Sequence, residues 1–388
     1  MKIRGFGKHL GPALLAAVLA LFFTAGLAAG QNIKDLPPPP PPPPTPTPTP
    51  VPPPKDEDLD VVRVTSNLVM VPVSVVNSMG QPVHGLQLND FRLEEQGREQ
   101  QITELGNPEQ VPLDIAILFD ISSSVSQKGF CEFQQKAAAS FLRQVMKPVD
   151  RAAVFTIAGE AGMVQPLATA EIAAAKLQRI PAATTSVPTA FYDTVAAAAK
   201  YLSENSGNGH RRVIVVISDG DDNFSRLVRE LTIAEARASQ RGEITRATAK
   251  RNLDIRRQQA VMAVQKAVHQ ADVAFYSVNP GGPSVRLNQI SMRAQSAMQS
   301  IAESTGGNAF VPDGERDLER VFSEVAAELR GQYLLQYYSN SQATGQEFRT
   351  IKVAVPSQTQ VRVRARQGYY PKDRLGETGR KDAKKTSP

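Results

Sequence analysis

The central part of the chain, about residues 112–331, alternates short apolar runs with Ala-rich stretches, and this alternation limits the available folds more than any other feature. The apolar runs have the length of buried strands, and the Ala-rich stretches have the length of helices. We interpret as strands the runs Leu113–Phe119, Ala152–Ile157, Val213–Ser218, Val273–Val278 and Ala309–Val311. The predicted helices include Lys136–Met146, Ala190–Leu202 and Leu318–Leu329. The pattern predicts an α/β fold, with a doubly wound, mostly parallel sheet covered by helices on both faces.

The segments on either side of this region have the two-residue alternation of antiparallel strands. The front segment places four residues on one strand face, namely Val69, Val71, Val73 and Val75. The rear segment contains three further predicted strands, Gln332–Tyr338, Phe348–Val355 and Val361–Arg366. Neither segment alone has enough strands for a stable sandwich. We therefore expect residues 59–110 and 332–370 to form one small β-sandwich, with the α/β domain of residues 111–331 inserted in it.

The N-terminus has the pattern of an export signal. A basic start is followed by an apolar stretch from Pro12 to Leu27 and by the small residues Ala28, Ala29 and Gly30. We predict a signal peptide over residues 1–30, with an uncleaved membrane anchor as the alternative. In either case the rest of the chain is exported, and its location is periplasmic, on the cell surface or secreted.

Proline is concentrated directly after this signal: residues 37–54 hold 14 of the 29 prolines. Such a run favours the extended polyproline II form, which rises about 3.1 Å per residue. We interpret residues 31–58 as a stalk, and the alternative is a docking peptide for a proline-binding domain.

The net charge of +6 comes from the two ends of the chain, and residues 31–370 are neutral. A basic pI therefore does not indicate a nucleic-acid-binding fold. Inside the neutral body, about residues 225–268 form a helical insertion with a basic excess. We expect it to be exposed, and the alternative is a surface for an anionic partner or a membrane. The basic tail, residues 371–388, has the composition of a disordered segment.

Polar side chains follow the first and third predicted strands. Asp120, Ser122 and Ser124 come directly after one strand, and Asp219 follows the other. Between them, the loop 184–189 carries three threonines and a serine before a helix. Ligands of such sheets bind at the carboxyl ends of the strands, and this set of oxygens suits Mg²⁺. Taken alone, the Asp-x-Ser-x-Ser sequence is equally suited to a helix N-cap.

These residues, in this order on these elements, resemble the metal-ion-dependent adhesion site of von Willebrand factor A domains. The resemblance implies that Ser122 and Ser124 bind a metal directly. It implies that Asp120 and Asp219 act through coordinated water, and that Thr189 joins when a ligand is engaged. The implied metal is Mg²⁺, or else Mn²⁺ or Ca²⁺, and a protein partner's Asp or Glu carboxylate completes its coordination.

The sequence leaves open which threonine belongs to the site. In this family glycines commonly precede that threonine, and here Thr185, Ser186, Val187 and Pro188 stand in their place. Thr184 or Thr185 could take the place of Thr189. Outside the A domain, the segments from Val83 to Phe91 and from Arg364 to Pro371 resemble an exported family built around such a domain and known from acidobacteria.

Motifs for catalysis are missing from the sequence. There is no Gly-x-Ser-x-Gly, His-Glu-x-x-His or phosphate-binding Gly-x-x-x-x-Gly-Lys-Ser/Thr. The histidines outside the signal are His84, His210 and His269, and none falls in the three polar loops. An aspartyl phosphatase would carry an acid where Ser122 stands. We therefore predict no enzymatic activity.

For several other side chains we predict a structural role. We interpret Asp221 and Asp222 as solvated loop acids, and Asp193 as a helix cap or a partner to the site. A basic strand face formed by Arg362, Arg364 and Arg366 is expected to be solvated. The single cysteine, Cys131, is expected to be a buried thiol, since one cysteine cannot form an internal disulfide.

The sequence thus predicts an exported, stalked adhesion protein that engages a protein partner through a metal ion. Two rivals from other classes are a metal-independent structural or assembly factor of the cell envelope and a metal-dependent hydrolase. Binding is further expected to couple to movement of the helix around Leu318–Leu329.

Overall fold

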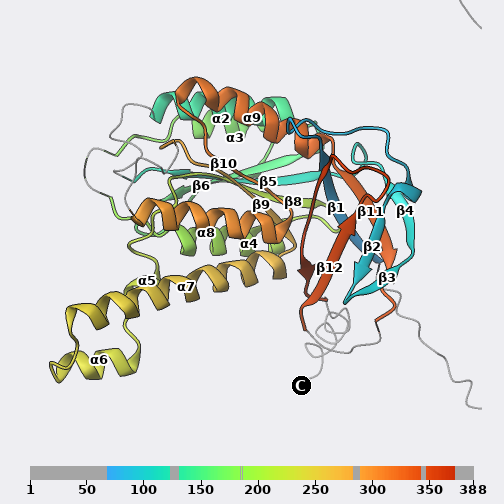
Figure 1. The fold of residues 1–388 in the computed structure, drawn as a ribbon. Helices are drawn as coiled ribbons and strands as arrows, with labels where there is room; N and C mark the ends of the chain where they lie inside the picture. The colour runs from blue at the N-terminus through green and yellow to red at the C-terminus, as the bar shows by residue number, and fades with distance from the viewer. Residues whose placement is uncertain are drawn as a thin grey trace, which may run out of the picture. The chain divides into compact units, whose positions relative to one another are not determined.

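A computed structural model describes residues 68–122, 131–183, 185, 187–282, 289–341 and 347–371 (Figure 1). The predicted signal, the proline-rich stalk and the basic tail from residue 372 lie outside the described residues, as do Ser124 and Thr184.

A six-stranded sheet forms the centre of the α/β region, with the order β10-β9-β8-β5-β6-β7. All neighbours in it are parallel except β6 and β7, which are antiparallel. The mostly parallel sheet predicted from the sequence is therefore confirmed. Its strands are β5 (Leu113–Asp120), β6 (Arg151–Ile157), β7 (Ala161–Ala168), β8 (Arg211–Ile217), β9 (Val273–Val278) and β10 (Ala309–Phe310).

Helices cover both faces of this sheet (Figure 1). One face packs against α2 (Cys131–Val145), α3 (Ala170–Leu177) and α9 (Glu315–Arg330). The other face packs against α4 (Phe191–Asn205), α7 (Arg246–Gln270) and α8 (Gln289–Thr305). The central strands are buried on both sides, because successive side chains alternate between the two clusters.

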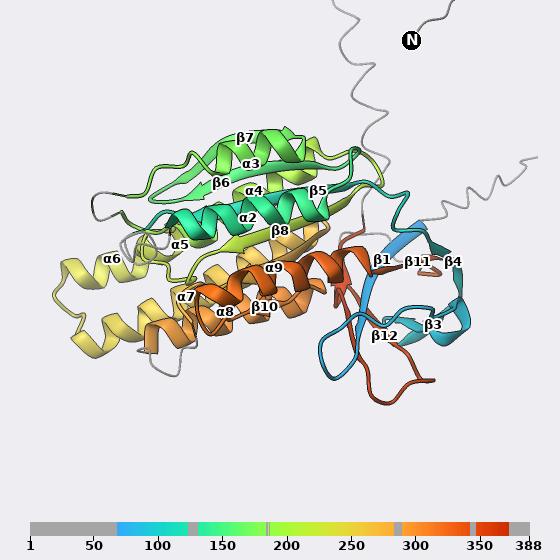
Figure 2. The same cartoon turned by 90° about the horizontal axis from the view of Figure 1, so that it is seen from above.

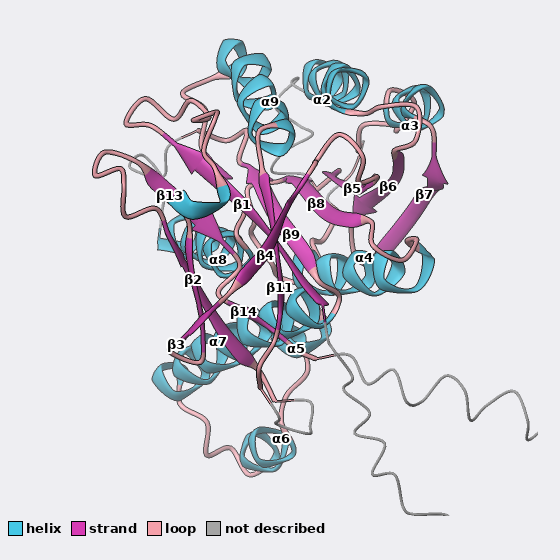
Figure 3. Cartoon of the chain, turned by 90° about the vertical axis from the view of Figure 1, so that its right-hand side faces the viewer, coloured by secondary structure: helices cyan, strands magenta, loops and turns pink. Residues whose placement is uncertain are grey.

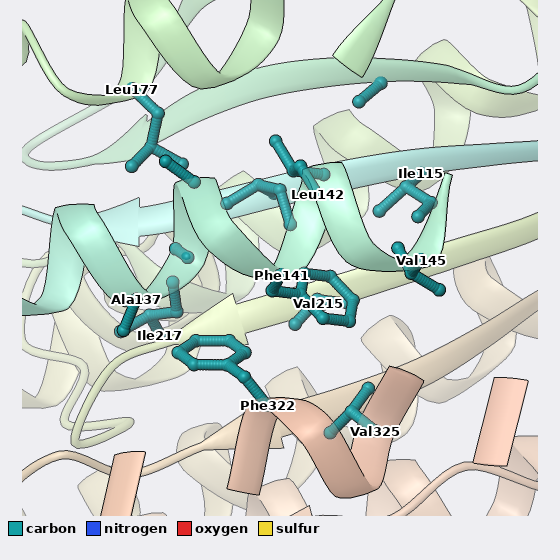
Figure 4. Packing of buried hydrophobic residues seen from close by; sticks show 14 of the residues in the cluster. Ile115, Ala137, Phe141, Leu142, Val145, Leu177, Val215, Ile217, Phe322 and Val325 are labelled. Atoms are coloured by element: carbon teal, nitrogen blue, oxygen red, sulfur yellow. The ribbon is translucent and has the colours of Figure 1, made fainter. Parts of the chain in front are cut away.

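The packing on the first face is close and apolar (Figure 4). Phe141 of α2 and Phe322 of α9 have ring centroids 5.4 Å apart. Figure 4 shows both rings in the cluster with Val215 and Ile217 of β8. Cys131 opens α2 as a buried free thiol, as predicted. This core fixes the strand ends from which the polar loops start.

Two four-stranded antiparallel sheets lie beside the α/β region (Figure 3). Their orders are β13-β1-β11-β4 and β14-β12-β2-β3. The strands are β1 (Leu68–Val76), β2 (Arg92–Glu95), β3 (Arg98–Gln100), β4 (Ile102–Gly106), β11 (Tyr333–Tyr338), β12 (Arg349–Ala354), β13 (Arg362–Ala365) and β14 (Gly368–Tyr369), with a 3-10 turn η1 at Leu88–Asp90. Both sheets combine strands from before and after the α/β region, and their apolar faces share one buried cluster, as the expected sandwich requires.

The prediction that the arginine face of this strand is solvated is wrong for two of its three arginines. Arg364 pairs with Glu328 of α9, with 2.5 Å between nitrogen and oxygen. Arg366 pairs with Asp272 and donates to the Met70 carbonyl at 2.7 Å. These two arginines join β13 and the residue after it to the α/β region. The alternation of residues within one strand cannot predict these ion pairs, because the acidic partners are far away in the sequence.

The basic insertion consists of three helices, α5 (Arg226–Arg229), α6 (Ile233–Gln240) and the long α7. The first break follows Glu230, and the second contains Gly242 with φ of 67°. No residue of α6 is buried. Figures 1 and 2 show α6 and the start of α7 extending beyond the sheet, as expected from the sequence. The later part of α7 instead packs on the sheet and buries Ala260, Val264 and Val268, so the expected exposure is wrong for that part of the insertion.

Candidate metal centre

The parallel register brings the polar loops to one edge of the sheet. Phe119 of β5 lies beside Ile217 of β8, so the next residues, Asp120 and Ser218, are neighbours at the carboxyl ends of these strands. On its other side, Asp120 lies beside Ile157 at the end of β6. Carboxyl edges of such sheets are the usual place for ligand sites.

The Asp120 carboxylate is almost fully buried, with 1% of its surface exposed. Its Oδ1 accepts the Ser122 N–H at 2.7 Å, and its Oδ2 accepts the Ser218 hydroxyl at 2.5 Å. Burial raises the pKa of Asp120 to about 6, and the negative charge of Asp219 adds to this, whereas the bonds from Ser218 and Ser122 oppose it. Asp120 is thus held rigidly beside a second acid.

Ser218 is a member of this cluster that the sequence analysis did not identify. Its Oγ also accepts the Gly220 N–H at 2.9 Å, so one hydroxyl fixes both Asp120 and the turn that carries Asp219. A hydroxyl residue directly before the second acid is the signal in the sequence that could have indicated this role.

Thr189 reaches the same edge from the loop before α4. Its side chain is buried, its N–H donates to Asn223 Oδ1 at 2.9 Å, and its carbonyl accepts the Asn223 N–H at 3.1 Å. The following N–H, of Ala190, donates to the Ala158 carbonyl just beyond β6 at 2.7 Å. Thr185, by contrast, is exposed.

Of the other predicted site residues, the structure describes Ser122 and Asp219. Ser122 is buried directly beside Asp120, and Asp219 is half-buried at the end of β8, where its Oδ1 accepts the Asp221 N–H at 3.3 Å. Ser124 lies outside the described residues. The structure therefore brings together Asp120, Ser122, Thr189 and Asp219 at one edge.

Asp222 is not a solvated loop acid, contrary to the sequence-based expectation. It is 4% exposed and accepts the N–H groups of Tyr192, Phe224 and Ser225, together with the Ser225 hydroxyl. It caps α4, whose own N-cap residue is an alanine and provides no side-chain acceptor. A cap supplied by a different loop leaves no local sequence pattern.

Asp193 has the capping role that the sequence suggested. Its Oδ2 accepts the Arg226 N–H, the first of α5, at 2.8 Å, and its own N–H donates to the Ser225 hydroxyl at 3.0 Å. Asp222 and Asp193 together fix the loop after β8 to the start of α4, which keeps Thr189 and Asp219 on adjoining loops.

The donors of this edge fit a hard divalent cation. They are carboxylate and hydroxyl oxygens, and in the described part of the chain neither Asp120 nor Asp219 forms an ion pair that would neutralise it. Among the same residues no three His, Cys, Asp or Glu side chains are grouped so that they could hold a metal ion.

The histidines lie away from this edge. His210 precedes β8, at the opposite end of the sheet, and its Nδ1 is 3.0 Å from Asp114 Oδ2. His269 lies near the end of α7, and His84 lies in the loop between β1 and η1. The site therefore has no imidazole base from these three residues.

The fold and the site define a doubly wound α/β domain with an oxygen-donor centre at the carboxyl edge of its sheet. The sequence pattern of the von Willebrand factor type A domain matches residues 114–324, more than half of the chain, and the chain belongs to this family. Domains of this family are typically non-enzymatic protein-interaction or adhesion modules, and they often bind a divalent metal.

Solved structures with a similar fold include an aerotolerance-related membrane protein from Bacteroides fragilis (17% identity, 56% of this chain and 98% of that chain, TM-score 0.37). Another is the PilB minor pilin of Streptococcus sanguinis (13% identity, 57% of this chain and 62% of that chain, TM-score 0.43). A third is proximal thread matrix protein 1 of mussel byssus with zinc in its metal site (14% identity, 60% of this chain and 48% of that chain, TM-score 0.38). Likenesses this weak carry no functional argument. No curated protein matches the chain. Within the described residues, no helix is both long and apolar enough to cross a membrane.

Proposed function

We propose that this chain is an exported adhesion protein that engages a protein partner through Mg²⁺ or Mn²⁺ at a centre formed by Asp120, Ser122, Ser124, Thr189 and Asp219. The observation that carries the proposal is the hydrogen bond between Ser218 and Asp120, which joins the ends of two parallel strands and fixes a buried carboxylate beside Asp219.

Each residue has a distinct part in this proposal. Ser122 and Ser124 would hold the cation directly through their hydroxyls, and Asp120 and Asp219 would hold it through water. Thr189 would join when the partner binds, and its burial and its bonds to Asn223 favour it over the exposed Thr185. When bound, the cation would supply an electrophilic centre for an Asp or Glu carboxylate of the partner.

Only two of the five proposed ligands, Asp120 and Asp219, are carboxylates, which supports binding of an external carboxylate. A centre with many carboxylates would neutralise the cation, whereas hydroxyl ligands leave its charge available. The proposal also includes the signal peptide over residues 1–30 and the stalk over residues 31–58, which would hold the folded part away from the cell surface.

The test is capture from cell-envelope extract with the immobilised chain of residues 31–388. The proposal expects a protein that is retained in Mg²⁺, released by EDTA, retained again when Mg²⁺ is restored, and lost with Ser122→Ala. Ser239→Ala, at an exposed serine of α6, is the matched control and should retain the partner. Equal capture in EDTA and with Ser122→Ala would contradict the proposal and favour a metal-independent envelope factor.

A further inference from the structure

The basic insertion, from Ser225 to Gln270, has ten basic and four acidic residues, and most of the basic ones remain unpaired. Three of the acids form ion pairs, namely Glu235 with Arg256, Glu243 with Arg241 and Asp254 with Arg293. Arg257 is near enough to Asp221 for their charges to interact. In the described part of the chain, six exposed basic side chains of the first half form no ion pair: Arg226, Arg229, Arg237, Arg246, Lys250 and Arg251. Glu230 is the one remaining acid, so this half of the insertion has a positive excess.

Three large aliphatic side chains are exposed among these charges. Leu227 is 41% exposed, Leu231 is 50% exposed and Ile233 is 73% exposed, and all three lie at the start of the insertion. A single exposed apolar side chain is common on protein surfaces, whereas a group of them rimmed by polar residues indicates an interaction surface. The start of the insertion therefore combines unpaired positive charge with apolar side chains that the fold does not cover.

Helical spacing places both kinds of side chain on common faces. Ile233 and Arg237 of α6 are four positions apart, so they lie on one face of that helix, and both are exposed. Arg251 and Ile255 of α7 have the same spacing, and Ile255 is 45% exposed. Figures 1 and 2 show α6 and the start of α7 extending beyond the sheet. This extending part can thus meet a large surface without the rest of the domain.

The chemistry of this part of the insertion fits a bilayer with anionic phospholipid headgroups. Five of the six unpaired basic residues are arginines, whose planar guanidinium matches the geometry of a phosphate group. Aliphatic side chains beside them can enter the boundary between headgroups and acyl chains. The segment from Ser225 to Gln270 contains no Phe, Tyr or Trp, the residues that protein interfaces favour and that stack on the bases of single strands.

We infer that α6 and the start of α7 bind the surface of an anionic phospholipid bilayer. Leu231 and Ile233 enter the headgroup region, and Arg237, Lys250 and Arg251 contact lipid phosphates. The contact is peripheral: the helices lie on the bilayer and do not cross it. It needs no metal, so the inference goes beyond the proposed function and does not depend on it.

The test is sedimentation of the chain of residues 31–388 with sucrose-loaded vesicles in EDTA, which removes any contribution of a metal. One set of vesicles contains phosphatidylcholine alone, and in the other set one third of the lipid is phosphatidylglycerol. We expect binding to the anionic vesicles only. This binding should weaken as the salt concentration rises, because salt screens exposed charges.

A triple variant tests the charge of the surface. It replaces three exposed residues of the insertion by glutamine: Arg237→Gln, Lys250→Gln and Arg251→Gln. The partition coefficient on anionic vesicles should fall about a hundredfold, at about fivefold for each charge near the bilayer. The matched control removes three exposed charges elsewhere and should not lower it: Arg98→Gln, Lys176→Gln and Lys352→Gln.

A second variant, Ile233→Ser, tests the apolar part of the contact. It should weaken binding to anionic vesicles at least about fivefold, since one aliphatic side chain no longer leaves water. Binding to immobilised heparin, a soluble polyanion without an apolar interior, should not change. Met79→Ser is the control, because the Met79 side chain is 76% exposed and lies outside the insertion. Thermal unfolding shows that each variant is folded.

Three results would overturn the inference. Equal binding to both kinds of vesicle would show that charge is not recognised. Unchanged binding of the triple variant would place the contact on another basic segment, such as the tail of residues 371–388. Unchanged vesicle binding of Ile233→Ser would indicate a surface for a soluble polyanion instead of a bilayer. None of these results bears on the proposed metal centre, since all are obtained in EDTA.

Discussion

The Ser218 hydroxyl donates a hydrogen bond to Oδ2 of Asp120, with 2.5 Å between the two oxygens. The two residues are 98 positions apart in the chain and lie at the ends of the neighbouring parallel strands β8 and β5. Through this bond the two acid-bearing loops form one rigid edge, on which the proposed metal centre depends.

Loss of the Ser218 hydroxyl should therefore destabilise the fold. Ser218→Ala leaves the buried Oδ2 of Asp120 without its donor, and a hydrogen bond to a charged group contributes about 1.5–3 kcal/mol. We expect urea unfolding in EDTA to show a loss of this size. Ser239→Ala, at an exposed serine, should stay within about 0.5 kcal/mol of the wild type, and equal stability of the two variants would remove the role assigned to Ser218.

Asp222 should contribute more to stability than its place in a loop suggests. Asp222→Ala removes the acceptor of three backbone N–H groups and of the Ser225 hydroxyl, so we expect a loss of about 2–4 kcal/mol in urea unfolding. Asp313→Ala, at an exposed loop acid, is the control. A loss below about 0.5 kcal/mol for Asp222→Ala would show that α4 needs no cap from this loop.

His269 should make stability fall in acid. Burial and, to a smaller extent, the Arg366 charge lower its pKa from 6.5 to about 4, although a hydrogen bond with the Gly368 backbone and the Asp272 charge oppose the shift. Its ring packs edge-on against Phe348, with centroids 5.0 Å apart. Protonation is thus easier in the unfolded chain, so the stability from neutral His269 is complete above about pH 6.5 and is lost as the pH falls toward 4.

The measurement is the free energy of unfolding at pH 7 and pH 4.5 for the wild type, His269→Gln and the control His84→Gln. The decrease between the two pH values should be about 2 kcal/mol smaller in His269→Gln than in the other two proteins. Equal decreases in all three proteins would show that His269 titrates normally in the fold.

The ion pair between Glu328 and Arg364 should be the main polar link between α9 and β13. The two side chains are 5% and 13% exposed, and Glu328 Oε1 also accepts the Tyr276 hydroxyl at 3.1 Å. Arg364→Met leaves a buried carboxylate unpaired, so we expect a loss of about 3–5 kcal/mol in urea unfolding. Arg320→Met breaks exposed pairs on α9 and should cost less than about 1 kcal/mol; similar losses for both would contradict the assignment.

The central strands were predictable because their side chains are buried on both faces and therefore form continuous apolar runs, as in Val213–Ser218. Strand β7 was not identified, since it is an edge strand that contains Gly162 and Pro166 and exposes Met163. Helix α8 was also not named, although its buried residues Ala294, Met298, Ile301, Ala302, Ser304 and Thr305 follow the helical spacing.

The site was predictable where chemistry follows a strand directly, as with Asp120 and Asp219. It was not predictable where distant segments meet. Ser218, Asp222 and Arg364 act on residues that are 30 or more positions away, and only the folded chain shows these pairs.

Metal binding itself tests the central claim most directly. The chain of residues 31–388, freed of metal with EDTA and dialysed, is titrated with MnCl₂ by calorimetry and then with MgCl₂ in competition. The account predicts one saturable site per chain that is lost in Asp219→Ala and Ser122→Ala and retained in Asp313→Ala. No saturable binding by the wild type, or equal binding by Asp219→Ala, would contradict it.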